Sequence, residues 1–151
     1  MTARPTKNDD KTLLLDVEAL SLEIEGQVLL DHISFQLSQN EILALVGESG
    51  SGKSLLALSM LGLQPKKAKL SAYQLLFDRQ SLLSNDKKLW QKLRGNKIGM
   101  IFQEPQSSLN PSFRCGTQLL EVLQQHSSLS KKAQKDKIRE AFLEVQLAEP
   151  E

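Results

Sequence analysis

The sequence predicts an α/β fold with an antiparallel β-region at its N-terminal end and a P-loop NTPase core behind it. Two stretches in which apolar and polar residues alternate, 20–26 and 33–39, predict the paired strands. The third observation is the segment 43–62, LALVGESGSGKSLLALSMLG, which has the pattern of an apolar strand, a glycine-rich turn and a helix. In that order, the three form a socket for the phosphates of a nucleotide.

Composition excludes several classes of protein. The chain has 151 residues, of which 40% are hydrophobic and 25% charged, and its net charge is +1. These values are typical of one globular domain and provide no long-range field for nucleic acid or an anionic membrane. Cys115 is the one cysteine, which excludes an internal disulfide and a cysteine zinc site. The polar start and the short apolar run 42–46 predict neither a signal peptide nor a membrane span, so we expect a cytoplasmic protein.

The elements before the glycine loop follow from alternation. We expect a disordered lead-in at 1–12, then the strand 20–26, a turn at Gly26-Gln27 and the strand 33–39, which residues 28–30 could extend. Asn40 tolerates the left-handed turn that would lead into the next segment. The run 41–47, EILALVG, is apolar on both faces, as in a buried parallel strand.

The elements after the loop follow from caps and periodicity. The apolar helix 55–61 should be largely buried and end at Gly62 and Pro65. We then expect a strand at 71–78, a helix at 85–93 between Ser84 as N-cap and Gly95 as stop, a strand at 98–102, an irregular loop at 103–111 and helices at 116–126 and 131–147. The last helix has a predicted buried stripe of Ile138, Ala141, Phe142 and Val145.

The loop itself matches the pattern GxxxxGK[ST]. Its glycines let the backbone adopt angles that point successive N–H groups at phosphate oxygens, and the following helix adds its positive N-terminus. Lys53 would reach the β- and γ-phosphates, and the Ser54 hydroxyl would be a ligand of Mg²⁺. The predicted nucleotide-binding residues here are Gly47, Glu48, Ser49, Gly50, Ser51, Gly52, Lys53, Ser54 and Leu55.

Other conspicuous residues have simpler interpretations. His32 and His126 are far apart and have no partner at metal-ligand spacing, so we expect no metal site there. Trp90 is interpreted as part of a helix packing face. Between Pro65 and Lys97, nine basic residues stand against two acidic ones. We favour a solvated face for this region over a patch for anionic lipid or nucleotide.

The stretch IGMIFQEPQSSLNPSF at 98–113, together with LALVGESGSGKS at 43–54, resembles the ATP-binding-cassette (ABC) family. More narrowly, it resembles the ATPase subunits of dipeptide, oligopeptide and nickel importers, from about Leu13 to Leu147. The resemblance implies ATP and Mg²⁺ as cofactors, and it makes Gln103 the Q-loop residue that contacts the metal and the attacking water. It also implies transmembrane permease subunits and a second ATP-binding cassette as partners, on the inner face of the cytoplasmic membrane.

The chain departs from the family at two places. Ile24 stands where an aromatic residue usually stacks on adenine, so it would cover the base without stacking. The family also needs an apolar strand that ends in Asp and Glu. Asp16 and Asp31 end similar runs but precede the glycine loop and are interpreted as ordinary strand ends. Asp78 is followed by Arg79 and not by a glutamate, and Glu104 belongs to the Q-loop. The resemblance therefore implies that 13–151 is the N-terminal part of a cassette, incomplete at its C-terminal end.

Three functional hypotheses follow from this interpretation. The first is the N-terminal part of a peptide-importer ATPase, which binds MgATP weakly, hydrolyses none by itself and exposes unpaired, aggregation-prone strands. The second is a non-catalytic nucleotide-binding or permease-docking module that acts with another polypeptide. The third, a small P-loop kinase, is disfavoured because no arginine-rich lid segment is visible and the Ser-Leu-Asn-Pro loop would have no purpose in it.

Overall fold

A computed structural model describes residues 12–84 and 86–146, and at 106 and 107 it describes the backbone only. The chain divides into two compact units, Met1–Trp90 and Gln91–Glu151, which are described separately. The predicted lead-in, apart from Thr12, lies outside the described residues, as does the end of the predicted helix 131–147.

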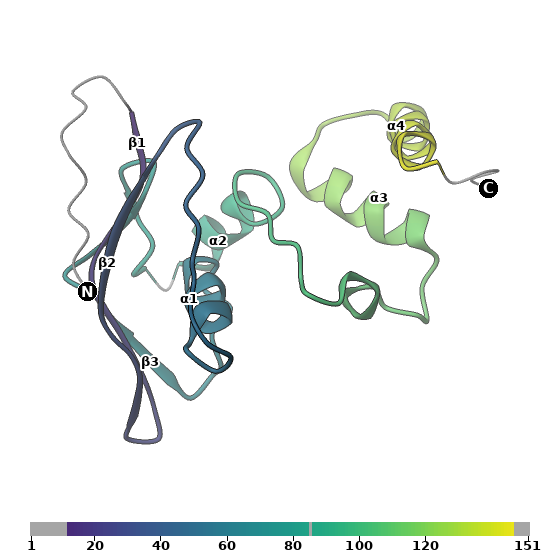
Figure 1. Ribbon diagram of the computed structural model, residues 1–151. Coiled ribbons are helices and arrows are strands. Elements are labelled where there is room, and N and C mark those ends of the chain that lie inside the picture. The colour runs from purple at the N-terminus through teal and green to yellow at the C-terminus, as the bar shows by residue number, and fades with distance from the viewer. Residues whose placement is uncertain (1–11, 85, 147–151) are drawn as a thin grey trace. The chain divides into compact units, whose positions relative to one another are not determined.

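The first unit is built on a long β-hairpin (Figure 1). Strands β1 (Leu13–Ile24) and β2 (Gln27–Ser38) pair in antiparallel fashion along their length. The turn residues Glu25 and Gly26 have φ angles of 51° and 87°, and two positive φ values in succession match the right-handed twist of paired strands. The predicted antiparallel opening is confirmed, and residues 28–30 do extend the second strand. The predicted turn at Gly26-Gln27 is wrong by one residue, because Gln27 already pairs in β2.

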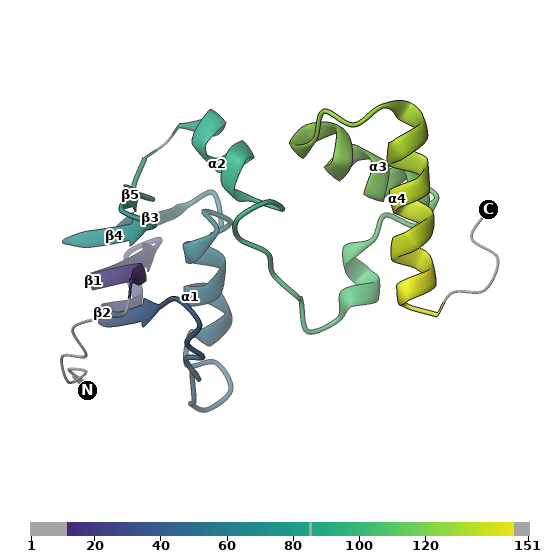
Figure 2. The same ribbon diagram turned by 90° about the horizontal axis from the view of Figure 1, so that it is seen from above.

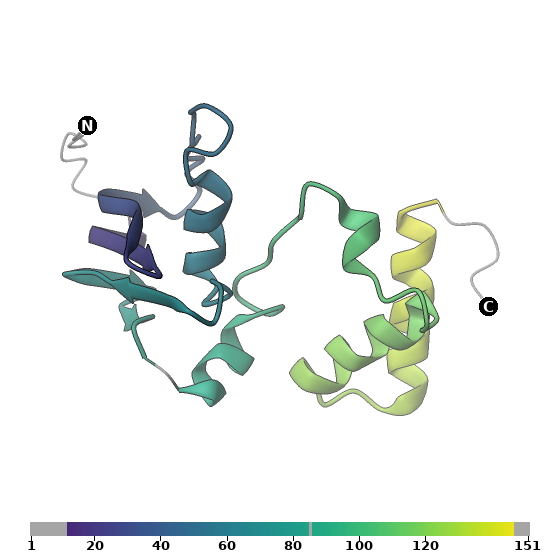
Figure 3. The same cartoon turned by 90° about the horizontal axis from the view of Figure 1, so that it is seen from below.

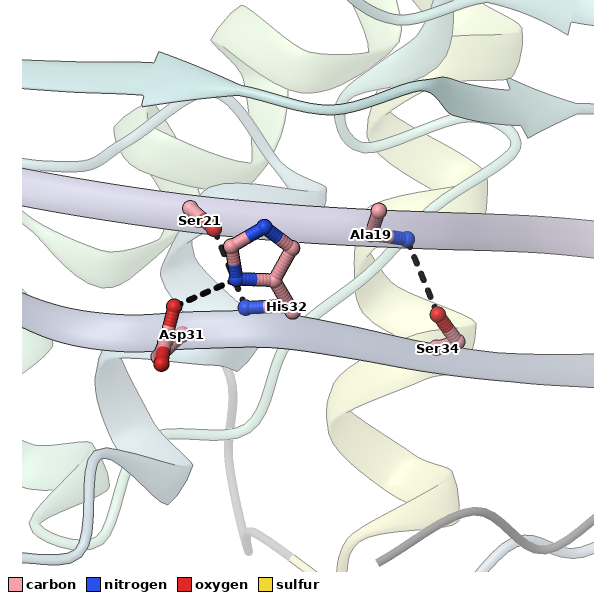
Figure 4. A network of polar contacts seen from close by, with 5 residues as sticks. All are labelled: Ala19, Ser21, Asp31, His32 and Ser34. Atoms are coloured by element: carbon pink, nitrogen blue, oxygen red, sulfur yellow. Dashed lines mark hydrogen bonds and ion pairs between the residues drawn. The ribbon is translucent and has the colours of Figure 1, made fainter.

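Two irregularities bend this hairpin, and two serines satisfy the backbone there (Figure 4). Ala19 and His32 have positive φ angles of 51° and 48°, close to shifts in the pairing register. The N–H of Ala19 donates to Ser34 Oγ at 2.9 Å, and the N–H of His32 donates to Ser21 Oγ at 3.0 Å. Each hydroxyl comes from the opposite strand and replaces the carbonyl that a regular ladder would supply.

Three short strands complete the sheet. β3 (Ala68–Ser71) pairs with Ser21–Ile24 of β1, β4 (Gln74–Phe77) pairs with Leu15–Glu18, and β5 (Gln80–Ser81) pairs with β4. The single strand predicted at 71–78 is therefore wrong. β1 is irregular at Ala19, between the two paired stretches, so the strand opposite it is also interrupted.

Helix α1 (Lys53–Met60) lies beside this sheet in the first unit (Figure 2). Leu20, Leu22 and Leu75 have no exposed surface, and Leu56 of the helix is 5% exposed. The helix ends as predicted, because Gly62 has φ 61° and the next N–H returns to the Leu58 carbonyl. The prediction of a largely buried helix is only partly confirmed, since Leu55 and Met60 remain half-buried.

Two predicted strands do not form. Residues 41–48 have no regular secondary structure, and Ile42 and Val46 are 96% and 94% exposed. The run 98–102 contributes a single parallel bridge, between Arg94 and Ile98. A strand that is apolar on both faces needs neighbouring strands to pair with. Among the described residues, no strand pairs with 42–46, so both predictions are wrong here.

Helix α2 (Lys87–Leu93) confirms the prediction of a helix before Gly95, which stops it with φ 75°. Its predicted N-cap was wrong by two residues. Asp86 Oδ1 accepts the N–H of Lys88, while Ser84 Oγ accepts the N–H of Asp86. Trp90 lies on this helix and is half-buried, and its indole N–H donates to the Ser84 carbonyl.

The second unit contains a helical pair, α3 (Cys115–His126) and α4 (Lys131–Glu144), which pack against each other (Figure 3). Ser130 Oγ caps α4 by accepting the N–H of Ala133. The predicted loop 103–111 contains one short 3₁₀ helix, η1 (Pro105–Ser108). The predicted stripe is incomplete because Val145 follows the end of α4 and is 66% exposed.

Candidate nucleotide-binding site

The glycine loop lies between the exposed run 42–46 and α1, and each of its glycines has a separate structural reason. A Cβ on Gly47 would lie 2.8 Å from Ser51 Oγ, so the loop closes on itself at this point. Gly50 has open space around it but a φ angle of 81°, which side-chain-bearing residues rarely adopt. Gly52 combines a φ of 89° with a position directly over β2, where a Cβ would lie 2.7 Å from Leu30 Cδ2.

The Lys53 ammonium group lies over this loop. Lys53 Nζ donates to the carbonyl oxygens of Gly47 at 2.7 Å and Glu48 at 2.6 Å, and to Ser51 Oγ at 3.3 Å. A flexible lysine side chain is thereby fixed at the mouth of a backbone turn. The positive charge lies where the loop and the start of α1 meet.

Backbone donors surround the same point. The first three N–H groups of α1, those of Lys53, Ser54 and Leu55, have no acceptor within residues 12–84 and 86–146. The Ser54 side chain is exposed, and Gly52 serves as a left-handed N-cap without a side-chain bond. Free N–H groups, a helix N-terminus and a fixed ammonium together make a receptor for an anion.

Ile24 lies at the end of β1, on the face of the sheet that carries this loop. Strand alternation puts Ile24 on the same side as Leu22, whose pairing partner is Leu30. Leu30 is the residue that touches the Gly52 position. Ile24 is half-buried, and the glutamates on either side of it form ion pairs with lysines of the β3 region, Glu23 with Lys69 and Glu25 with Lys67.

Two lysines of the basic region 66–97 take part in these ion pairs. Lys67 and Lys69 neutralise glutamates of the hairpin, at N–O distances of 2.5 and 3.6 Å. In this part of the region, exposed lysines lie beside glutamates in solvent, which agrees with the prediction of a solvated face.

Gln103 belongs to the second unit. It is exposed and lies in a bend just before η1. The structure thus brings together Gly47–Leu55, while Gln103 stands on a separate segment. No group of three or more His, Cys, Asp or Glu side chains in the described part of the chain could hold a metal ion.

Sequence reasoning missed Gln118, on the second turn of α3. Its side-chain oxygen accepts the N–H of Asn110 at 3.0 Å, and its nitrogen donates to the carbonyls of Asn110 and Phe113, each at 3.1 Å. Asn110 Oδ1 also accepts the N–H of Ser112, closing a turn. The sequence predicted an irregular loop at 103–111, but nothing in the sequence pattern identified the glutamine that binds its end.

The carboxylates weighed as metal or base candidates lie elsewhere in the fold. Asp16 is in the middle of β1, where the side-chain amides of Gln36 and Gln74 donate to it. Asp31 binds the ring of its neighbour His32. Asp78 follows β4 in a turn with φ 47°. The interpretation of Asp16 and Asp31 as strand ends is therefore wrong, because Asp16 lies within β1 and Asp31 lies within β2.

Comparison with known proteins gives a consistent result. Residues 30–150 match the model of a protein family described as ABC transporter. The chain is 40% identical over 142 residues to a dipeptide transport ATP-binding protein of Haemophilus influenzae, covering 91% of this chain and 43% of that protein. It is 37% identical over 153 residues to a probable peptide ABC transporter ATP-binding protein of Sinorhizobium fredii, covering 98% and 46%.

A third relative, an oligopeptide transport ATP-binding protein of Bacillus subtilis, is 38% identical over 145 residues, covering 93% of this chain and 40% of that protein. The chain thus spans less than half the length of these relatives. Among the helices in the described ranges, none has both the length and the apolar character needed to span a bilayer.

Proposed function

Because this chain belongs to the ABC transporter family, we propose that its loop Gly47–Ser54 binds the phosphates of MgATP. The observation that carries the proposal is the Lys53 ammonium, which is held by the Gly47 and Glu48 carbonyls beside the free N–H groups of α1. Phosphate oxygens carry full charge and are stronger partners for an ammonium than neutral carbonyls. Lys53 would exchange these carbonyls for the β- and γ-phosphates.

The proposed ligands of the metal are one residue of α1 and one residue of the segment before η1. The exposed Ser54 hydroxyl is a hard oxygen donor of the kind that Mg²⁺ prefers, and the Gln103 amide oxygen is a second one in this proposal. When bound, Mg²⁺ neutralises the charge between the terminal phosphates of the nucleotide. Ile24 would cover the adenine ring, on the face of the sheet that its alternation with Leu22 gives it.

Calorimetry with purified protein tests this assignment. Lys53→Ala should abolish measurable MgATP binding, because the backbone donors cannot replace the lost charge. Lys66→Ala removes the same charge from an exposed site elsewhere in the first unit and serves as the matched control. Ser54→Ala should weaken ATP binding only when Mg²⁺ is present. Equal affinities of the Lys53→Ala variant and the parent would overturn the assignment.

The 151-residue chain by itself should bind ATP without hydrolysing it. Within the described residues, no strand pairs with 42–46, so no carboxylate follows a strand next to the loop. Asp16 is already held by two amides, and Asp31 by His32. Phosphate release should therefore not exceed that of Lys53→Ala. Clear turnover would indicate that a carboxylate of this chain, Asp16 or Glu104, supports hydrolysis.

The relatives' names guide the larger proposal. We propose that the chain supplies the nucleotide-binding segment of a peptide importer, which works with permease subunits and a second cassette at the inner face of the cytoplasmic membrane. One feature of the second unit supports a membrane partner. A groove of about 460 Å³ lies between α3 and α4. It is lined by Arg114, Gly116, Thr117, Leu120, Lys135, Asp136, Ile138, Arg139 and Phe142.

The groove suits an amphipathic, acidic segment of a permease subunit, since its lining includes apolar side chains and three cations against one carboxylate. Gly116 gives a test. A Cβ there would lie 3.7 Å from Phe142 Cε2, an ordinary contact, so Gly116→Ala should be tolerated. Gly116→Leu should fill the groove and reduce co-purification with co-expressed peptide-permease subunits. Equal recovery of the permease with both variants would exclude this surface.

A further inference from the structure

We propose that Gln118 is a positioning residue for Gln103, which it serves by clamping the end of the exposed segment that carries Gln103 to helix α3. This inference rests on the proposed role of Gln103 in the nucleotide site. It concerns a residue that the nucleotide-binding motifs do not include, and it follows from hydrogen bonds within the second unit alone.

In this clamp, one side chain binds both the backbone N–H and the backbone carbonyl of the same residue. Gln118 Oε1 accepts the N–H of Asn110, and Gln118 Nε2 donates to the carbonyl of the same residue. The same nitrogen donates to the carbonyl of Phe113, three residues further on. All three distances are 3.0 or 3.1 Å. A side-chain amide that makes a donor and an acceptor bond to one residue fixes the orientation of that residue as well as its position.

The neighbouring contacts make this a rigid end point. Asn110 Oδ1 accepts the N–H of Ser112, and the Phe113 N–H donates to the Asn110 carbonyl. On α3, the N–H of Gln118 returns to the Arg114 carbonyl, so the clamping residue is part of a regular helical turn. The segment 110–113 is thus a closed turn joined to a helix.

The effect should reach Gln103 because Gln103 lies in an exposed segment that is joined to the clamped turn through the short helix η1. Residues 99–104 have no regular structure, and Ile101 and Phe102 are 91% and 41% exposed. Gln103 itself is exposed. An exposed segment samples many conformations unless its ends are fixed, so fixing Asn110 limits the positions that Gln103 can adopt.

Amide hydrogen exchange on the full 151-residue chain measures the clamp directly. Gln118→Met keeps the size of the side chain and removes all three bonds, so the protection factor of the Asn110 amide should fall about fivefold, the factor expected for one hydrogen bond. Gln125→Met is the matched control, because Gln125 lies seven residues further along the same face of α3 and is exposed. Unchanged protection at Asn110 in Gln118→Met would overturn the proposal.

Gln118→Glu tests the same bonds within one folded protein. At pH 7.5 the introduced carboxylate can still accept the Asn110 N–H but cannot donate to the Asn110 and Phe113 carbonyls, so the other amides of the turn 110–113 should lose protection. When the pH falls to about 3.5, below the usual pKa of a glutamate, the carboxyl gains a proton, can donate to one of the two carbonyls while its other oxygen accepts, and should restore part of the protection. Gln125→Glu, measured in parallel, should show no such recovery. A pH-independent profile for Gln118→Glu would contradict the clamp.

A double-mutant cycle connects the clamp to nucleotide binding. In the parent background, Gln118→Met should weaken MgATP binding about threefold or more, whereas in a Gln103→Ala background it should have no further effect. If Gln103→Ala by itself leaves MgATP affinity unchanged, the proposed function of Gln103 fails, and exchange at Asn110 alone decides whether the clamp exists. If Gln103→Ala weakens binding and the two effects simply add, Gln118 does not position Gln103.

Discussion

The two units of this chain stabilise their candidate functional residues in different ways. In the first unit, the glycine loop rests on a buried core, since the Gly52 position touches Leu30, which is 5% exposed and pairs with the fully buried Leu22. In the second unit, α3 has no buried residue, and the buried residue of α4 is Gln134. Gln103 there depends on a segment held by side-chain hydrogen bonds. Hydrophobic packing thus positions one candidate site, and polar contacts position the other.

The largest expected effect tests whether the core lies mainly in the first unit. Leu22→Ala should destabilise that unit by about 3 kcal/mol, because it removes a fully buried side chain and leaves a cavity. Leu120→Ala, at a half-buried position of α3, should cost about 1 kcal/mol, in proportion to the smaller area that it buries.

Amide hydrogen exchange reports opening free energies for each unit separately, so both variants can be compared with the parent in one measurement. Equal losses in the two units would contradict the contrast. In that case α3 would have to be covered by a partner in solution.

The same contrast explains which elements the sequence could predict. The β1–β2 hairpin follows from alternation and a glycine turn, because neighbouring strands pair locally and the register is set by the turn. Helix α4 follows from the helical spacing of Ile138, Ala141 and Phe142. The apolar runs 42–46 and 98–102 look like strands, but a parallel strand forms only with distant partners, and a local pattern carries no information about those partners.

The candidate site also has a part that the sequence could predict and a part that it could not. The spacing of Gly47, Gly50 and Gly52 predicts a phosphate loop because each glycine is needed for the backbone path of that loop, and the structure gives each one a separate reason. Gln118 could not be predicted, because its partners are backbone groups whose positions depend on the turn at 110–113. Residues that act on the backbone of a loop leave no periodic signal.

A smaller effect tests whether the glycine loop depends on the core. Gly52→Ala should cost about 2 kcal/mol in stability, since it combines a left-handed backbone with a methyl group 2.7 Å from Leu30 Cδ2. Gly50→Ala has the strained backbone but open space around it, so about 1 kcal/mol is expected. Gly99→Ala, in the exposed segment of the second unit, has neither feature and should be neutral.

Chemical denaturation ranks these three variants by their loss of stability, and MgATP calorimetry ranks them by their loss of nucleotide affinity. Gly52→Ala should also weaken nucleotide binding more than Gly50→Ala does, because only Gly52 rests directly on β2. If Gly50→Ala proves the more damaging change, the loop is independent of the hairpin beneath it.

The smallest expected effect on stability compares the two exposed apolar runs. Ile42 in the first unit and Ile101 in the second are 96% and 91% exposed, so replacing either with lysine removes almost no packing. Ile42→Lys and Ile101→Lys should therefore each change the free energy of unfolding by less than about 0.5 kcal/mol.

Both runs have the short, β-prone, low-charge pattern of aggregating segments, so each added charge should reduce self-association. Light scattering of the two variants shows which unit dominates that association, and we expect the larger reduction from Ile42→Lys because its neighbour Val46 is also 94% exposed. A loss of 2 kcal/mol or more in Ile42→Lys would mean that the run is buried in solution, and it would then extend the core of the first unit through the segment that leads into the glycine loop.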